Sequence, residues 1–507
     1  MPATSPPPII VWFRQDLRVA DNPALHAAAA TGRAVAPVYI LDNAADAPWP
    51  LGGASRWWLH GALAALQASL AKLGAPLILR QGDSANVLAA LIKETGADAL
   101  YWNRCYEPAA IERDKDIKTA LKARHIDVQS FNSALLFEPW EIRTQSETPF
   151  KVFTPFHKAV LNAPPPRTPL AAPKKLVSIP QQPASDALEA WNLRPTKPDW
   201  AGGLRAAWSP GEAAAKKRLS QFLDNAVAHY AKGRDVPGEA LTSRLSPHLH
   251  FGEISPHHIW HATLAREQTS GTATFLKELV WREFAYHLLY HFPVLPDEPL
   301  RPEFKAFPWK ADAKLLRAWQ RGLTGYPIVD AGLRELWATG WMHNRVRMIA
   351  ASLLVKHLLQ PWQAGAAWFW DTLVDADLAN NSTSWQWVAG CGTDAAPYFR
   401  VFNPVLQGLK FDAGGAYVRR WVPEIARLPD EWLHKPWDAP EGVLKDAGVM
   451  LGRTYPIPVV SLNAGRDRAL AAFKTLRVAD ETDMSPPRPG SREARPKRKL
   501  QRGSRAS

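Results

Sequence analysis

The segment TSRLSPHLHFGEISP, residues 242–256, gathers hydroxyl side chains where a helix is predicted to begin. Thr242, Ser243 and Ser246 lie at that start, and Arg244 stands among them. Hydroxyls and free backbone N–H groups at a helix N-terminus form an anion site that suits a pyrophosphate. The same residues also form an ordinary N-cap, so this segment alone does not decide between the two interpretations.

A second segment, ELVWRE, places an acid, an indole and a guanidinium on one helical face. Glu278, Trp281 and Arg282 are spaced i, i+3 and i+4, and residues at this spacing are neighbours on a helix. The pattern fits a polar site, and it equally fits a surface salt bridge beside a core tryptophan.

Two further segments combine polar and aromatic groups. In WMHNRVRM, Asn344 and Met348 share a helical face, and Arg345 and Arg347 flank it. The stretch DADLANNSTSWQW, residues 375–387, holds two carboxylates, two asparagine amides and two indoles. We expect this stretch to be a poor helix, because Asp and Asn side chains compete for backbone hydrogen bonds. Its polar groups need partners if they lie inside a helical domain.

The first 130 residues alternate strand-like and helix-like patterns. Short apolar runs stand at 9–13 and 34–41 and in PLILR and ALYWN, and helical patterns cover 22–32, 55–73 and 85–96. This order predicts a Rossmann-like, doubly wound parallel sheet with helices on both faces. The first strand-to-helix turn, WFRQDLRVADNPAL, lacks the G-x-G-x-x-G fingerprint of dinucleotide binding.

The remaining chain divides by composition. Residues 131–210 are rich in proline and predict a long linker. Residues 211–475 show helical periodicity and predict a large all-α domain. Residues 476–507 form a basic tail that lacks the apolar side chains needed for a core. The predicted domains are therefore 1–130, 131–210, 211–475 and 476–507.

Bulk composition narrows the class of protein. The chain has 507 residues and a net charge of +13, which favours a polyanionic partner. Only Cys105 and Cys391 are present, which argues against a disulfide framework and a cysteine metal motif. No apolar run is long enough to span a membrane, and the N-terminus lacks a secretion signal. We expect a cytoplasmic enzyme that binds no metal.

The ordered motifs resemble those of the photolyase/cryptochrome family. They are WFRQDLRVADNPAL, TSRLSPHLHFGEISP, ELVWREF, TGYPIVDAGLRELWATGWMHNRVRM, DADLANNSTSWQW and GTDAAPYFRVFNP. The resemblance extends from about residue 9 to about residue 475, and it implies an α/β domain followed by a helical domain that binds FAD. It further implies light-driven repair of cyclobutane pyrimidine dimers in DNA, a carbon–carbon lyase activity. The alternative within the family is a cryptochrome-type blue-light photoreceptor.

The resemblance also implies which residues hold FAD. The set combines the hydroxyl segment with the polar clusters: Tyr230, Thr242, Ser243, Arg244, Leu245, Ser246, Glu278, Trp281, Arg282, Asn344, Arg347, Asp375, Asp377 and Asn381. Arg347 is expected to pair with Asp375 beside the flavin ring, where its charge stabilises a reduced, anionic flavin. Trp385, Trp362 and Trp309 match the family's electron-transfer chain, and with Glu278 and Asn381 they complete the expected catalytic set.

Substrate capture is expected to follow base flipping, because a dimer cannot be reached inside a stacked duplex. Trp281 and Trp387 would stack on the lesion, Met348 would make an apolar contact, and Glu278 and Asn344 would bond the pyrimidine edges. Residues Arg234, Arg345 and Arg400 match family positions that contact DNA phosphates, which set position without reading sequence.

Two positions favour dimer repair over the other activities of the family. Repair enzymes typically carry Asn at the position of Asn381, where plant cryptochromes carry Asp and animal ones usually Cys. Enzymes for (6-4) lesions place a second His where Asn344 stands. One residue departs from some relatives, because Phe275 stands where they have a cavity-wall Trp.

The antenna pigment is less constrained than FAD. The family's α/β domain often holds methenyltetrahydrofolate or a deazaflavin, and we expect the folate. Trp57, Trp58 and Trp102 have the ring area to stack on a pigment, but burial in the core is the favoured role for each. The family is typically monomeric, so we expect a monomer.

Overall fold

The first part of the chain folds into a sheet of parallel strands. A computed structural model describes residues 6–42, 49–393 and 400–482. The strands run in the order β3-β2-β1-β4-β5, and β6 pairs with the start of β2. Their bounds are β1 (Ile9–Phe13), β2 (Ala34–Leu41), β3 (Ile78–Gln81), β4 (Ala99–Asn103), β5 (Asp127–Phe131) and β6 (Val177–Ser178). The connecting helices are α1 (Pro23–Ala30), α2 (Gly53–Leu73), α3 (Ser84–Thr95) and α4 (Pro108–Lys122).

Strand β1 shows why this sheet is buried on both faces. Ile9, Val11 and Phe13 belong to one apolar cluster, whereas Ile10 and Trp12 belong to another. Successive side chains of a strand point to opposite faces, so each cluster is the core beneath one helical layer. The predicted doubly wound α/β sheet is confirmed.

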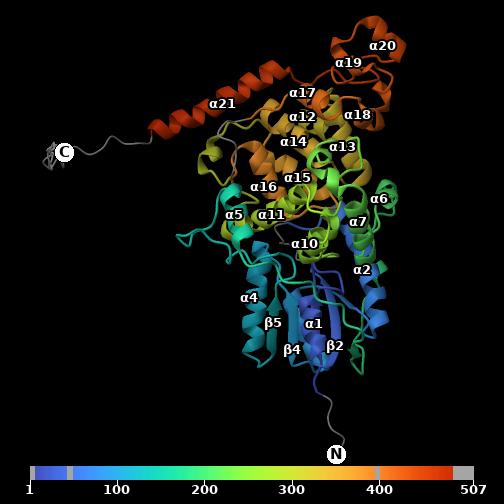
Figure 1. The fold of residues 1–507 in the computed structure, drawn as a ribbon, viewed down its shortest axis with the longest axis vertical. Helices are drawn as coiled ribbons and strands as arrows, with labels where there is room; N and C mark the ends of the chain where they lie inside the picture. Colours follow the sequence, from blue (N-terminus) through green and yellow to red (C-terminus); the bar gives the residue numbers. More distant parts are fainter. Residues whose placement is uncertain (1–5, 43–48, 394–399, 483–507) are drawn as a thin grey trace, which may run out of the picture.

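The helical part of the chain packs onto the carboxyl edge of this sheet (Figure 1). Leu17, just after β1, donates its N–H to the carbonyl of Phe251 at 3.1 Å, and Arg18 Nη1 donates to the carbonyl of Gly252 at 2.8 Å. Gly252 has a φ of +63°, and a Cβ there would lie 2.1 Å from the Gln15 carbonyl oxygen. Glycine is therefore required where the two parts meet.

The rest of the described chain is almost entirely helical, which confirms the predicted all-α part. The predicted linker contributes α5 (Phe153–Asn162), strand β6, η1 (Leu188–Trp191) and α6 (Gly202–Ala207). The α-helices that follow are α7 (Glu212–Asn225), α8 (Tyr230–Gly233), α9 (Ser246–His250), α10 (Pro256–Leu264), α11 (Ser270–His291), α12 (Ala313–Gln320), α13 (Pro327–Thr339), α14 (Asn344–Ser352), α15 (Trp362–Thr372), α16 (Leu378–Ala389), α17 (Pro404–Phe411), α18 (Ala416–Trp421), α19 (Asp430–Leu433), α20 (Glu441–Ala447) and α21 (Leu462–Thr482). Short helical turns are η2 (Val227–His229), η3 (Pro302–Ala306), the π-helix η4 (Leu353–His357), η5 (Pro423–Ile425) and η6 (Pro436–Asp438).

One prediction is wrong. The stretch 375–387 is not a poor helix, because most of it lies in α16. Asp377 caps this helix and accepts a hydrogen bond from the Asn380 N–H at 2.8 Å. An Asp side chain competes with backbone hydrogen bonds when it lies inside a helix. At the N-cap position, the same side chain stabilises the helix.

Candidate functional site

Helix α16 is the centre of the candidate site. It packs against α11, α14 and α15, which together carry eight other predicted site residues. These helices come from separate parts of the sequence, and their packing brings the polar clusters of 278–282, 344–348 and 375–387 into one region.

Arg347 and Asp375 form an ion pair in this region. Arg347 Nη2 lies 2.9 Å from Asp375 Oδ2 and 3.1 Å from Oδ1, and Arg347 Nε donates to the Met342 carbonyl at 2.7 Å. The Asp375 side chain is only 3% exposed, whereas that of Arg347 is 23% exposed. The pair was expected from the sequence, and it leaves part of a fixed cation open to a neighbouring group.

Asp377 and Asn381 are held at the start of α16. Asp377 Oδ1 accepts from the N–H and the side-chain amide of Asn380, and Oδ2 accepts from the Tyr286 hydroxyl. The Asn381 amide donates to the Ala366 carbonyl of α15 at 3.1 Å. The amide oxygen of Asn381 makes no hydrogen bond within the described residues, so it remains available to a partner.

Glu278 is paired with Arg234 beside Tyr230. The Arg234 guanidinium forms an ion pair with Glu278 and lies 6.0 Å from the centre of the Tyr230 ring. Burial raises the pKa of Glu278, and the neighbouring Arg234 cation opposes that rise. Tyr230 itself packs against Phe275, which is buried at 4% exposure and also contacts Phe222. Phe275 therefore lies in the core.

The neighbouring side chains of Trp281 and Arg282 on α11 have different environments. Trp281 stacks on Phe153 of α5 with ring centres 3.5 Å apart and planes 5° apart. Arg282 is buried, donates to the Ala134 carbonyl at 2.7 Å, and lies 4.7 Å from the centre of the Tyr286 ring. Neither Phe153 nor Tyr286 stood out in the sequence, because aromatic residues of this kind are common in any helical core.

The hydroxyl segment lies at the start of α9. No side chain caps that helix, and the hydroxyls of Thr242 and Ser246 make no hydrogen bond within the described residues. Ser243 Oγ accepts from the N–H of Leu245, which is buried. Arg244 has a φ of +50°, and its guanidinium lies between two indoles, 4.8 Å from Trp208 and 4.4 Å from Trp341.

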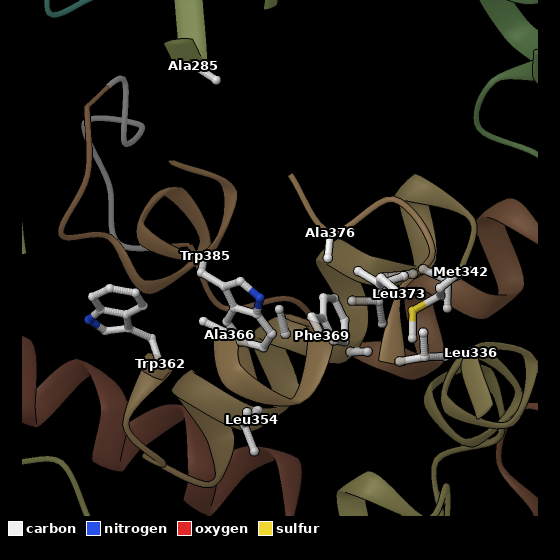
Figure 2. Close-up of a cluster of buried hydrophobic side chains, with 14 of the residues drawn as sticks. Ala285, Leu336, Met342, Leu354, Trp362, Ala366, Phe369, Leu373, Ala376 and Trp385 are labelled. Atoms are coloured by element: carbon white, nitrogen blue, oxygen red, sulfur yellow. The ribbon is translucent and has the colours of Figure 1, made fainter. Parts of the chain in front are cut away.

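The three predicted electron-transfer tryptophans differ in burial. Trp385 and Trp362 are 2% and 1% exposed, and both lie in the apolar cluster of Figure 2, together with Ala366 and Phe369. Trp309 is half-buried, and the next residue, Lys310, donates its N–H to the carbonyl of Leu359, three residues before Trp362. A Cβ on Gly365 would lie 2.1 Å from Trp385, so α15 and α16 meet closely at this indole.

The residues predicted to contact DNA differ in their surroundings. Asn344 and Arg400 are exposed, and Met348 and Trp387 are half-buried. Arg345 pairs with Asp235 at 2.7 Å, lies 4.5 Å from the centre of the Phe411 ring, and approaches Met348 Sδ at 3.8 Å. Residues 394–399 of the predicted GTDAAPYFRVFNP motif and 483–507 of the basic tail lie outside the described residues.

Comparison with known proteins identifies the family. Residues 9–174 match the family described as DNA photolyase, and residues 275–475 match the FAD binding domain of DNA photolyase. A deoxyribodipyrimidine photo-lyase of Agrobacterium fabrum is 52% identical over 473 residues, which cover 93% of this chain and 98% of that protein. The chain belongs to the photolyase/cryptochrome family. Its helical part therefore contains the family's FAD-binding domain.

Two further relatives show where the chain stands within this family. The crystal structure of a bacterial class III photolyase from Agrobacterium tumefaciens superposes with a TM-score of 0.91 at 51% identity, covering 94% of this chain and 99% of that one. Cryptochrome-1 of Arabidopsis thaliana is 39% identical, over 96% of this chain and 72% of that protein. The photolyases named here are thus more similar to the chain than this cryptochrome.

The described residues contain neither a membrane-spanning helix nor a metal-binding cluster. None of their helices is long and apolar enough to cross a membrane. No group of three or more His, Cys, Asp or Glu side chains in the same residues is arranged to hold a metal ion.

Proposed function

We propose that this protein repairs cyclobutane pyrimidine dimers in DNA, using blue light and bound reduced FAD. The observation that carries the proposal is the junction of α14, α15 and α16. There the Arg347–Asp375 ion pair, the free amide oxygen of Asn381 and the two buried indoles of Trp385 and Trp362 belong to one packed unit. The 52% identity to a photo-lyase over nearly the whole chain agrees with it.

The residues of the helical part suit a flavin dinucleotide. Arg244 Nε is buried without a hydrogen-bond partner, the Thr242 and Ser246 hydroxyls are free, and α9 begins without a side-chain cap. These are donors that a pyrophosphate requires. We propose that residues 211–475 form the flavin domain and that Tyr230, Leu245, Glu278, Trp281, Arg282 and Asn344 line the same site.

The residues around the flavin would stabilise its charge, orient its ring or conduct an electron to it. FAD, when bound and reduced, would supply the electron that opens the cyclobutane ring. Arg347, held by Asp375, would stabilise negative charge where water is excluded. Asn381 would present its amide oxygen to the ring edge, where it can accept a hydrogen bond from a protonated ring nitrogen. Trp385, Trp362 and Trp309 would carry an electron inward from the surface.

The substrate face would hold the extruded dimer. Trp281 and Trp387 offer stacking area, Met348 an apolar contact, and Asn344 a side chain free for a base edge. Glu278 is already bound to Arg234, and Arg345 to Asp235. Phosphate contacts by these two arginines would therefore compete with ion pairs, whereas Arg400 is exposed.

We propose that methenyltetrahydrofolate is the antenna pigment. We also propose that the protein is a cytoplasmic monomer. Ligands of doubly wound sheets usually bind where the strand order reverses, here between β1 and β4. In this protein Arg14, Asp16 and Asn103 fill that crevice with buried hydrogen bonds, and Arg14 pairs with Asp114 at 2.6 Å. Trp57, Trp58 and Trp102 are at most 2% exposed, which supports their predicted place in the core. We therefore place the pigment outside the crevice.

The proposal is tested with purified, reduced protein and an oligonucleotide carrying one thymine dimer. Blue light should restore the two thymines, a dark sample should not, and Asn344→Ala should slow repair by weakening dimer binding. Intact dimers after illumination of a flavin-loaded sample would refute the proposal and favour a photoreceptor.

A further inference from the structure

Tyr286 lies where three parts of the chain meet. It belongs to α11, its ring packs edge-to-face on Tyr106 after β4 at 6.2 Å, and the Arg282 guanidinium covers it at 4.7 Å. Tyr106 in turn donates its hydroxyl to Glu138 of the linker at 2.7 Å. The Tyr286 ring is therefore clamped from two sides, and the side chain is only 4% exposed.

The clamped ring directs its hydroxyl to Asp377. Tyr286 donates to Asp377 Oδ2, and His250 Nδ1 lies 4.0 Å from the same oxygen. At that distance His250 makes no hydrogen bond to the carboxylate, and burial lowers the pKa of its ring, so it does not replace the hydroxyl. Burial also raises the pKa of Tyr286, so the hydroxyl keeps its proton.

Asp377 connects this hydrogen bond to the candidate site. Its other carboxylate oxygen caps α16 through Asn380, and its carbonyl accepts the Asn381 N–H at 2.8 Å. The orientation of the Asp377 carboxylate therefore sets the first turn of the helix that carries Asn381 and Trp385.

We infer that Tyr286 is a positioning residue: through its hydroxyl it fixes Asp377, and through Asp377 the start of α16 against the bound flavin. This inference rests on the proposed function. Without the hydroxyl, Asp377 Oδ2 is a buried carboxylate oxygen with no donor, and the cap can rotate. The negative charge of Asp377, then less well stabilised, disfavours added negative charge on a nearby flavin.

The test compares Tyr286→Phe with Tyr290→Phe in the full-length, flavin-loaded protein. Tyr290 lies one turn further along α11, packs on Trp140 at 5.4 Å, and its hydroxyl makes no hydrogen bond within the described residues. Two quantities are measured: amide hydrogen exchange of residues 378–382 and the midpoint potential of the bound flavin. In Tyr286→Phe, exchange should be about tenfold faster, equivalent to about 1.4 kcal/mol, and the potential should become more negative. Tyr290→Phe should match the wild type.

Two results in Tyr286→Phe would overturn the inference. They are unchanged exchange, whatever the potential, and faster exchange with an unchanged potential. If Tyr286→Phe does not fold, the Asp377→Ala variant supplies the test: exchange should again be faster, but the potential should become less negative because a negative charge is removed, and a wild-type potential in it would overturn the inference. A wild-type protein that fails to repair dimers would count against the proposed function alone, because exchange and potential remain measurable.

Discussion

Burial of Glu283 should make the stability of this protein fall as pH rises. Glu283 lies on α11, 4% exposed, and lines a small cavity with Phe156 and His287. Its Oε2 accepts from the N–H groups of Leu136 at 2.8 Å and Phe137 at 3.2 Å, while Oε1 has no hydrogen-bond partner within the described residues and lies 3.7 Å from Arg282 Nη1. Burial raises the pKa of Glu283 from 4.5 to about 7.

The size of the stability loss follows from the raised pKa of Glu283. In the unfolded chain the carboxyl loses its proton near the ordinary glutamate pKa of 4.5, but in the folded protein only near 7. Between these values the folded state holds more protons, so each rise in pH destabilises it. From about pH 5 to about pH 8 the loss amounts to about 2.5 kcal/mol. Glu283→Gln keeps an acceptor for the two N–H groups and carries no charge, so it should remove this loss.

The assay is urea unfolding at both pH values, followed by tryptophan fluorescence. Glu283→Gln should gain about 2.5 kcal/mol on the wild type as the pH rises through this range. Glu267→Gln is the matched control, because Glu267 is exposed and should leave the wild-type pH dependence unchanged. A Glu283→Gln variant whose stability tracks the wild type at both pH values would refute the reasoning.

Three further changes test the site. Gly365→Ala puts a Cβ 2.1 Å from Trp385, so overpacking should destabilise the fold by about 1–3 kcal/mol in urea unfolding, and wild-type stability would contradict this contact. Arg347→Gln leaves the buried Asp375 carboxylate without its cation, a cost of about 3 kcal/mol, and should lower the flavin-to-protein ratio after gel filtration. Trp362→Phe should reduce light-driven flavin reduction to near the background rate in a time-resolved absorption measurement, and reduction at the wild-type rate would exclude this route.

The sheet could be predicted because its signals are local. Strand β2 has the expected bounds of 34–41, since an apolar run buried on both faces shows its ends in the sequence. Helix α2 ends at Leu73 because Gly74, with a φ of +95°, accepts the left-handed conformation that stops a helix. Such features depend on neighbouring residues alone.

The site could be predicted only in its residue types. The family motifs name Glu278 and Arg234, but their ion pair joins residues 44 positions apart. Tyr286 was missed altogether, because its partner Asp377 is 91 positions away and a lone tyrosine in a helix has no distinctive pattern. The α16 prediction was wrong for a related reason: whether an Asp disrupts or caps a helix depends on where the helix begins.

The most direct test of the central claim is a count of dimers restored per bound flavin. The protein is reduced beforehand, free reductant is removed, oxygen is excluded, and dimer-containing DNA is supplied in excess under blue light. If the electron transferred to each dimer returns to the flavin, many dimers per flavin should be restored under light without further reductant. No dimers should be restored in the dark. Restoration that stops at one dimer per flavin, or that proceeds equally in the dark, would contradict the account.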